Sequence, residues 1–176
     1  MRKLTTLELN RLNVADYQYV KKLPIIIILD NVRSMENVGS FFRTADAFRI
    51  EALYLCGITA RPPHREIHKT ALGAEESVNW MYFETTKEAC EALKEKGYRI
   101  FAVEQVENSI KLDDFNINEK SAYIFGNEVD GVDDNILPYC EQAIEIPQEG
   151  TKHSLNVSVS AGIVMYHLFH NMKNLL

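Results

Sequence analysis

The sequence predicts an α/β fold, a mostly parallel six-stranded sheet with helices on both faces. From residue 25 onward, short apolar runs alternate with segments of helical periodicity, which is typical of a parallel sheet covered by helices. Several of these runs are apolar throughout, as expected of strands that are buried on both faces. With 176 residues, 46% of them hydrophobic, the chain is long enough for one compact domain spanning residues 1–176.

The expected strands are the apolar runs themselves. They are Ile25–Leu29, Ala52–Cys56, Val78–Tyr82, Arg99–Val103, Tyr123–Phe125 and Ala143–Ile146.

Two helices are expected between these strands. Met35–Phe48 has apolar residues at positions 38, 41, 42, 45 and 48, the stripe of an amphipathic helix. Lys87–Lys96 follows two threonines that can cap a helix and ends at Gly97, a residue suited to helix termination.

Two terminal segments are also expected to be helical. Ser158–Lys173 is more apolar than one core-facing stripe requires, so we expect part of it to pack against a partner subunit. Residues 1–22 form a leading helical extension of the same domain, suggested by Leu4, Leu7, Leu9, Leu12 and Val14.

Composition narrows the class of protein. The longest apolar run, Leu23–Leu29, is far shorter than the roughly 20 residues that a membrane-spanning helix needs. The first residues are too polar for a signal-peptide core, which favours the cytoplasm. Cys56, Cys90 and Cys140 lie far apart and form no C-x-x-C pair, which indicates buried thiols in a reducing compartment.

The net charge of −6 disfavours broad, non-specific nucleic-acid binding, which depends on many lysine and arginine contacts. An RNA partner would need a local basic patch. One candidate is the stretch Arg61–Lys69, which contains five basic or histidine residues and one acid, Glu66. A solvated loop is the alternative interpretation of this stretch.

Polar and glycine-rich residues form three clusters, each just beyond the carboxyl end of an expected strand, where open α/β sheets bind ligands. In the first cluster, Gly39 lies one turn before Arg43, which predicts room for a phosphate or ribose beneath the guanidinium. Ser34 and Asn37 at the helix start offer polar groups near free backbone N–H donors. Alternatively, these two residues only cap the helix and Arg43 is solvated.

The second cluster, Gly126–Val132, has glycines on both sides of Asn127 and Glu128, which predicts a tight turn against a ligand. In the third, Ser154 and Asn156 fall on one side of an extended segment while Leu155 faces away and could pack on a flat apolar group. The alternative for the third cluster is simple capping of the last helix.

Several common sites are disfavoured. No G-x-G-x-x-G fingerprint, G-K-[ST] phosphate loop or G-x-S-x-G elbow occurs. The pairs His64/His68 and His167/His170 have helical spacing, but no carboxylate or cysteine accompanies them at ligand spacing, so no metal is expected.

Taken together and in this order, the three clusters resemble the sequence motifs of the SpoU/TrmH family within the SPOUT methyltransferase superfamily. The first is Asn37-x-Gly39-x-x-x-Arg43-Thr44-Ala45 and the second is Gly126-Asn127-Glu128-x-x-Gly131. The third runs from Ile146-Pro147 to Ser154-Leu155-Asn156-Val157-Ser158. The resemblance covers roughly Ile25 to Asn171.

This resemblance implies an S-adenosylmethionine-dependent RNA ribose 2′-O-methyltransferase that releases S-adenosylhomocysteine. It implies a C-terminal deep trefoil knot that forms the cofactor pocket, although threaded chains are very rare. It also implies a homodimer joined through the C-terminal helix and the leading helix. The partner would be a structured tRNA or rRNA.

The resemblance assigns roles to individual residues. The cofactor pocket would be lined by Val103, Glu104, Gly126, Asn127, Gly131, Ile146 and Leu155. The methyl-transfer site would be formed by Asn37, Arg43, Glu128, Ser154 and Asn156. RNA phosphates would be bound by Arg33, Arg61, Arg65 and Lys69.

Arg43 is expected to stabilise the developing alkoxide electrostatically, because a guanidinium with a pKa above about 12 rarely gives up a proton. An RNA phosphate would then take the proton. Two other classes stay open: a dimeric RNA-binding module that keeps the fold and the cofactor pocket without methyl transfer, and a generic α/β nucleotide-binding protein. The sequence does not contain the separate N-terminal RNA-binding domain of the ribosomal-RNA members, so the identity of the RNA stays open.

Overall fold

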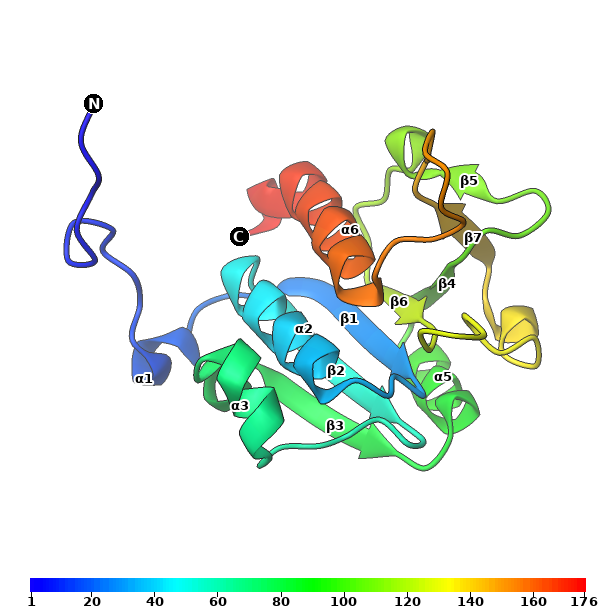
Figure 1. Cartoon of the computed structure of the whole chain (residues 1–176), viewed down its shortest axis with the longest axis horizontal. Helices are drawn as coiled ribbons and strands as arrows, with labels where there is room; N and C mark the ends of the chain where they lie inside the picture. The colour runs from blue at the N-terminus through cyan, green and yellow to red at the C-terminus, as the bar shows by residue number, and fades with distance from the viewer.

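The computed structural model describes all 176 residues and contains one seven-stranded sheet in the order β3-β2-β1-β6-β4-β7-β5 (Figure 1). Every pair of neighbouring strands is parallel. The strands are β1 Leu23–Asp30, β2 Ile50–Cys56, β3 Asn79–Phe83, β4 Arg99–Val103, β5 Ile110–Lys111, β6 Ser121–Phe125 and β7 Gln142–Glu145.

The α/β class and the parallel sheet are confirmed, but the expected number of strands was one too low. The additional strand, β5, has only two residues, both exposed, and exists through its pairing with β7. A segment this short carries no apolar run, so sequence periodicity does not reveal it.

Helices cover both faces of the sheet, as expected (Figure 1). They are α1 Val14–Tyr17, α2 Met35–Ala47, α3 Arg65–Ala71, α4 Ala74–Ser77, α5 Thr86–Glu95 and α6 Val157–Met172, with short 3-10 turns at Leu112–Asp114, Leu137–Tyr139 and Lys173–Leu175. None of the helices combines the length and the apolar character needed to cross a lipid bilayer.

Strand β1 lies inside the sheet, between β2 and β6, and the sheet divides the core in two. Ile25, Ile27 and Leu29 pack with α2, α3, α4 and α6, whereas Ile26 and Ile28 pack with α5 on the opposite face. Because successive side chains of a strand point to opposite faces, a continuous run of isoleucines is what a doubly covered central strand requires.

Helix α2 confirms the amphipathic stripe, with Val38, Phe41, Phe42 and Ala45 buried and the side chain of Ser34 capping Asn37 N at 3.2 Å. The expected space beneath Arg43 is absent. A Cβ on Gly39 would lie 2.3 Å from Ile67 O and 2.1 Å from Thr70 Oγ1, because α3 packs directly on this glycine. Gly39 therefore serves helix packing, and the prediction of a phosphate or ribose pocket there was wrong.

The other helix bounds agree closely with the predictions. Helix α5 begins one residue earlier than expected, at a capping box formed by Thr85 and Glu88. Helix α6 likewise begins one residue early, after an Asn156 N-cap. The sequence patterns gave no indication of α3, which begins immediately after Pro62, Pro63 and its N-cap His64.

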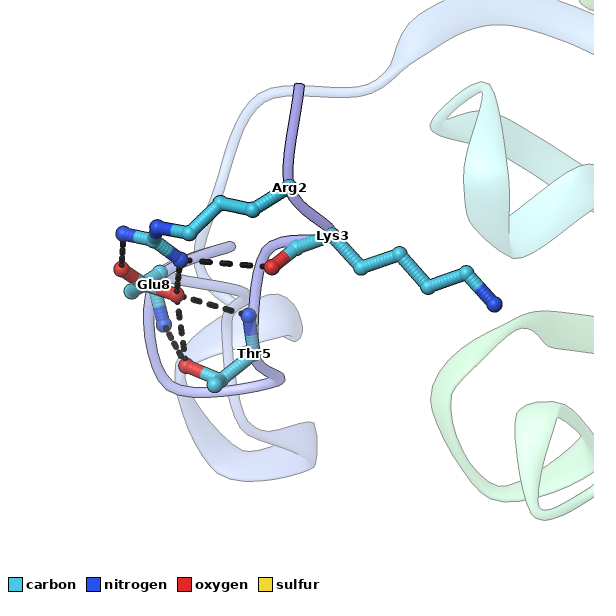
Figure 2. A network of polar contacts seen from close by, with 4 residues as sticks. All are labelled: Arg2, Lys3, Thr5 and Glu8. Carbon is cyan, nitrogen blue, oxygen red and sulfur yellow. Dashed lines mark hydrogen bonds and ion pairs between the residues drawn. The ribbon is translucent and has the colours of Figure 1, made fainter.

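The leading segment is mostly not helical, contrary to expectation. Only α1, four residues long, is formed, and residues 1–13 make an arm that extends away from the body of the molecule (Figure 1). Figure 2 shows an internal network in this arm, where Glu8 accepts from Arg2 at 2.5 Å and from Thr5 N at 2.7 Å while Lys3 points away. A short helix without a surface to pack on is marginal in water, which accounts for the difference.

Candidate functional site

A cavity of about 480 Å³ opens at the carboxyl ends of β4, β6 and β7, where the loops that follow these strands meet. All seven residues predicted for the cofactor pocket line it, as do three of the five predicted for methyl transfer, Glu128, Ser154 and Asn156. The second and third sequence clusters therefore form one cavity, although residues 133–145 separate them in the chain.

The loop after β6 is the tight turn that its glycines predicted. Asn127 N donates to Gly131 O at 3.1 Å, and Gly131 N donates to Asn127 O at 3.2 Å. A Cβ on Gly126 would lie 1.9 Å from Gly131 C, and Gly131 has a φ of +73°. The Asn127 side chain closes the turn by accepting from Val129 N and Asp130 N. Side chains are excluded at both glycines because neighbouring protein atoms already occupy the space, so the turn can only close with glycine at these positions.

Glu104, predicted to contact cofactor, also holds this turn in place. Its Oε2 accepts from Val132 N at 3.1 Å, and its Oε1 accepts from Gln105 N at 2.9 Å. The carboxylate occupies the space that a Gly131 side chain would fill. Glu104 thus joins the end of β4 to the loop after β6.

Asp30 is a second anchor for the same loop and was missed by the sequence predictions. It is 2% exposed and accepts from Thr86 Oγ1 at 2.5 Å, from Asn31 Nδ2 at 2.9 Å and from Asp133 N at 3.1 Å. The sequence feature that could have identified Asp30 is its position directly after a fully apolar strand. A carboxylate buried there requires hydrogen-bonding partners.

Glu128 connects the second cluster to the start of α2. Its carboxylate accepts from Arg33 N at 3.0 Å, from Ser34 N at 3.0 Å and from Asn37 Nδ2 at 2.8 Å. Burial raises the pKa of Glu128, but the hydrogen bonds from Arg33, Asn37 and Ser34 together outweigh it and lower the pKa below its usual value. Glu128 is therefore an ionised acceptor at a helix N-terminus, a favourable position for a negative charge.

Asn37 and Asn156 extend this connection to the third cluster. Asn156 Nδ2 donates to Asn37 Oδ1 at 3.2 Å, while Asn156 Oδ1 accepts from Ser158 N at 2.9 Å and caps α6. Asn156 thus caps the last helix, as the alternative interpretation of the third cluster expected, and its side chain also donates to Asn37 of the first cluster. A continuous chain of hydrogen bonds, Glu128–Asn37–Asn156, joins all three clusters.

The third loop covers the cavity from the outside. Residues Glu149–Asn156 are exposed, including Leu155, which lines the cavity with 38% of its surface exposed. Gln105 Nε2 donates to His153 O at 3.0 Å, so the loop also contacts the segment after β4.

Arg43 lies elsewhere. It projects from the outer face of α2, is exposed, forms no hydrogen bond or ion pair, and does not line the cavity. Within one chain, the structure brings together four of the five predicted methyl-transfer residues and leaves Arg43 apart from them.

The predicted RNA-binding residues are dispersed and partly neutralised. Arg33 lies 3.9 Å from Asp130, and Lys69 lies between Glu36 at 3.5 Å and Glu66 at 3.6 Å. The guanidinium of Arg61 stacks 4.0 Å above the Tyr82 ring. Arg65 makes no ion pair and is exposed.

Histidines and cysteines add no reactive group to the cavity. No cluster of three or more histidine, cysteine or acidic side chains has a geometry suited to a metal ion. Burial raises the pKa of Cys56 and Cys90 to about 12 and that of Cys140 to about 11, so all three are neutral thiols at physiological pH.

Comparison with known proteins places these features in a family context. Residues 24–166 match the model of the SpoU rRNA Methylase family. The chain is 32% identical over 142 residues to a 23S rRNA (guanosine-2′-O-)-methyltransferase of Neisseria meningitidis, an alignment that covers 81% of this chain and 56% of that enzyme. The chain thus spans little more than half the length of this relative.

Solved structures share the fold at low sequence identity. A TrmH/SpoU tRNA modifying enzyme of Aquifex aeolicus superposes with a TM-score of 0.81 at 23% identity, covering 92% of this chain and 81% of that one. A SpoU methyltransferase of Streptomyces viridochromogenes, solved in complex with the cofactor AdoMet, has a TM-score of 0.76 at 22% identity and covers 88% of this chain and 60% of that one.

Proposed function

Because the chain belongs to the SpoU rRNA methylase family, we propose that it transfers a methyl group from S-adenosylmethionine to a ribose 2′-hydroxyl of a structured RNA, leaving S-adenosylhomocysteine. The family match confirms the resemblance seen in the three motifs. The observation that carries the proposal is the cavity in which two motif loops meet, tied to the third motif through Glu128, Asn37 and Asn156.

The residues lining the cavity suit this cofactor. Its volume of about 480 Å³ lies within the range of small-molecule sites. Gly126 and Gly131 present bare backbone, while Val103, Ile146 and Leu155 supply apolar contacts for an adenine ring. When bound there, S-adenosylmethionine supplies a methyl group on a sulfonium.

The polar side chains would act on the RNA. Ser154 and Asn156, at the mouth of the cavity, would orient the ribose, and Asn37 would hold Asn156 in place. Positioning a poor nucleophile for attack accounts for much of the acceleration that such enzymes achieve. Glu128 would act as a positioning residue rather than a base, since its lone pairs already accept three hydrogen bonds.

Arg43 would stabilise the alkoxide that develops at the ribose oxygen, with an RNA phosphate accepting the proton. We propose that the chain forms a homodimer joined at α6 and the N-terminal arm, and that this dimer brings Arg43 of one subunit to the cavity of the other. Exposed apolar side chains on α6 support this dimer. Helix α6 packs beside α2, and its large side chains Val159, Ile163 and Tyr166 stay exposed. Arg43 would then face the partner subunit's cavity.

We also propose that the C-terminal segment is threaded as a deep trefoil knot. After β7, near one edge of the sheet, the chain returns to pack α6 against α2 over the central strands. His167 Nε2 lies 2.8 Å from Phe115 O, so α6 is fastened to the segment that connects β5 and β6. An experimental crystal structure that traces this crossing tests the proposal.

We further propose the organisation, location and RNA contacts of the chain. The chain forms one domain with the arm as its extension, the compartment is the cytoplasm, and Arg33, Arg61, Arg65 and Lys69 meet RNA phosphates. The RNA is a tRNA or an rRNA; the similar proteins named above include one acting on each.

Transfer of labelled methyl groups from S-adenosylmethionine to total bacterial RNA tests the proposed function. We expect ribose-methylated nucleotides after digestion, abolished by Arg43→Ala while cofactor affinity, measured by calorimetry, stays within about twofold. Lys87→Ala, which removes an exposed cation from α5 on the other face of the sheet, is the control. Methyl groups on bases, or turnover that survives Arg43→Ala, would contradict the assignment.

A dimeric RNA-binding module without methyl transfer is the second candidate, because Arg43 does not reach the cavity of its own chain. Binding of S-adenosylmethionine and RNA by the wild-type protein, with no label incorporated into any RNA fraction, would establish this alternative.

A further inference from the structure

A second cavity, of about 530 Å³, lies outside the candidate site, between the start of α3, helix α4 and the edge strand β3. We call it the Trp80 pocket. The residues that matter for its chemistry are Pro62, Pro63, Arg65, Glu76 and Trp80, all of which line it. None of the residues that line the first cavity contributes to it.

One wall of the Trp80 pocket is aromatic. Trp80, the only tryptophan of the chain, is half-buried on β3. Tyr82 follows two residues later on the same face of the strand and carries the stacked guanidinium of Arg61. Aromatic faces with flanking arginines are the surfaces on which unstacked bases of single-stranded RNA are held.

The charges around the pocket fit a nucleotide better than a simple anion. His68 and Lys69 are engaged by neighbouring carboxylates, His68 by Glu75 and Lys69 by Glu66 and Glu36. Arg65 and Arg61 have no carboxylate partner and can meet phosphates. Glu76 lines the pocket, is exposed and has no hydrogen-bonding partner for its side chain.

A carboxylate only accepts hydrogen bonds at neutral pH, so Glu76 selects a group that donates. Adenine, cytosine and guanine carry an exocyclic amino group. Uracil instead offers only its N3–H, which lies between two carbonyl oxygens that a carboxylate repels. An amino-bearing nucleotide residue of RNA joins a flat ring, an amino donor and flanking phosphates.

We propose that the Trp80 pocket takes one unstacked, amino-bearing base of the RNA, stacked on Trp80 and donating to Glu76, with the adjacent phosphates at Arg65 and Arg61. That this RNA is the methylation substrate rests on the proposed function. The pocket thereby gives a specific role to the basic stretch Arg61–Lys69, whose other cations are largely paired.

Because Trp80 is the only tryptophan, its fluorescence reports on this pocket directly. The full chain without cofactor is titrated with the pentanucleotides rC5 and rU5. Their bases differ only at N3 and at the group on C4, an amino group in cytosine and a carbonyl oxygen in uracil. We expect rC5 to quench the fluorescence and to bind roughly tenfold more tightly than rU5, the size expected for one base-edge contact. Labelled rC5 should bind Trp80→Ala roughly tenfold more weakly in fluorescence anisotropy.

Glu76→Gln should abolish the preference for rC5, since a carboxamide can donate to uracil as well as accept. Glu95→Gln, an exposed glutamate on α5 at the other face of the sheet, is the matched control and should keep the preference. Thermal unfolding of each variant verifies that it folds. Equal affinity for the two pentanucleotides, absent quenching, or a preference that survives Glu76→Gln would each overturn the proposal.

The titration needs neither cofactor nor Arg43, so the two proposals fail separately. Quenching by rC5 that depends on Glu76 supports the pocket even if no methyl group is transferred. Methyl transfer without such quenching overturns the pocket and leaves the proposed function intact.

Discussion

At the scale of single residues, Glu128 shows how one carboxylate organises the site. It accepts from two backbone N–H groups and one side chain at the start of α2, from a position 95 residues away from Arg33 in the chain. The sequence motif located this residue but could not indicate its role, because the contact depends on the tertiary meeting of two loops.

Replacing Glu128 with Gln should destabilise the fold, because one side of the carboxamide is a donor and would face a backbone N–H. We expect a loss of about 1.5–3 kcal/mol in the free energy of unfolding, as for hydrogen bonds to a charged group. Urea unfolding measures it. Glu107→Gln, on an exposed loop, is the control, and equal midpoints for the two variants would show that the Glu128 contacts contribute nothing.

The same residue predicts a pH dependence. Because the folded pKa of Glu128 lies below its usual value of 4.5, its contribution to stability is fully present above about that value. It is lost as the pH falls through the lower folded pKa. The difference in unfolding free energy between wild type and Glu128→Gln should therefore be largest at neutral pH and shrink toward about pH 3. A constant difference over this range would show that charge on Glu128 is not involved.

Asp30 illustrates what residue patterns leave out. The motifs identified the residues that line the cavity. Asp30, whose carboxylate accepts hydrogen bonds from Asp133 N and Thr86 Oγ1, belongs to none of the motifs. Arg43 is the opposite case, because it belongs to a motif but does not line the cavity of its own chain. Its position follows from the face of α2 on which it lies.

At the scale of elements, the long segments were predictable because burial alone determines their patterns. Strand β1 and helices α2, α5 and α6 each bury a complete face, so apolar periodicity defines them within a few residues. Three other elements could not be predicted in this way. Strand β5 depends on pairing with a neighbouring strand, and helix α3 follows a loop that ends in prolines. The arm is not helical because no surface is available for it to pack on.

The loop after β6 supplies a prediction at this scale. In Gly126→Ala, the new Cβ would lie 1.9 Å from Gly131 C, so the loop must shift. We expect a destabilisation of about 1–3 kcal/mol, typical of overpacking, together with the loss of cofactor binding in calorimetry. Gly150→Ala is the control because nothing lies within 4 Å of its Cβ. Unchanged cofactor affinity in Gly126→Ala would remove this loop from the pocket.

At the scale of the whole molecule, the surface is consistent with the homodimer that the motif resemblance implies. Large apolar side chains stay exposed on α6, at Val159, Ile163 and Tyr166, and along the N-terminal arm, at Leu4 and Leu7. The apolar excess of the last helix was visible in the sequence. That a second copy covers it came only from the family resemblance, because local patterns carry no information about what covers a surface.

If a second copy covers α6, Ile163→Glu should separate the subunits, since the interface would then bury a charge without a partner. In light scattering at micromolar concentration, we expect wild type at twice the chain mass of 20.2 kDa and the variant at 20.2 kDa. Ile58→Glu, equally apolar and 64% exposed but on the loop after β2, should stay dimeric. Methyl transfer should disappear with the dimer if Arg43 acts on the partner subunit's cavity. A monomeric variant that keeps full activity would show that one chain completes the site by itself, and a wild type of 20.2 kDa would remove the dimer altogether.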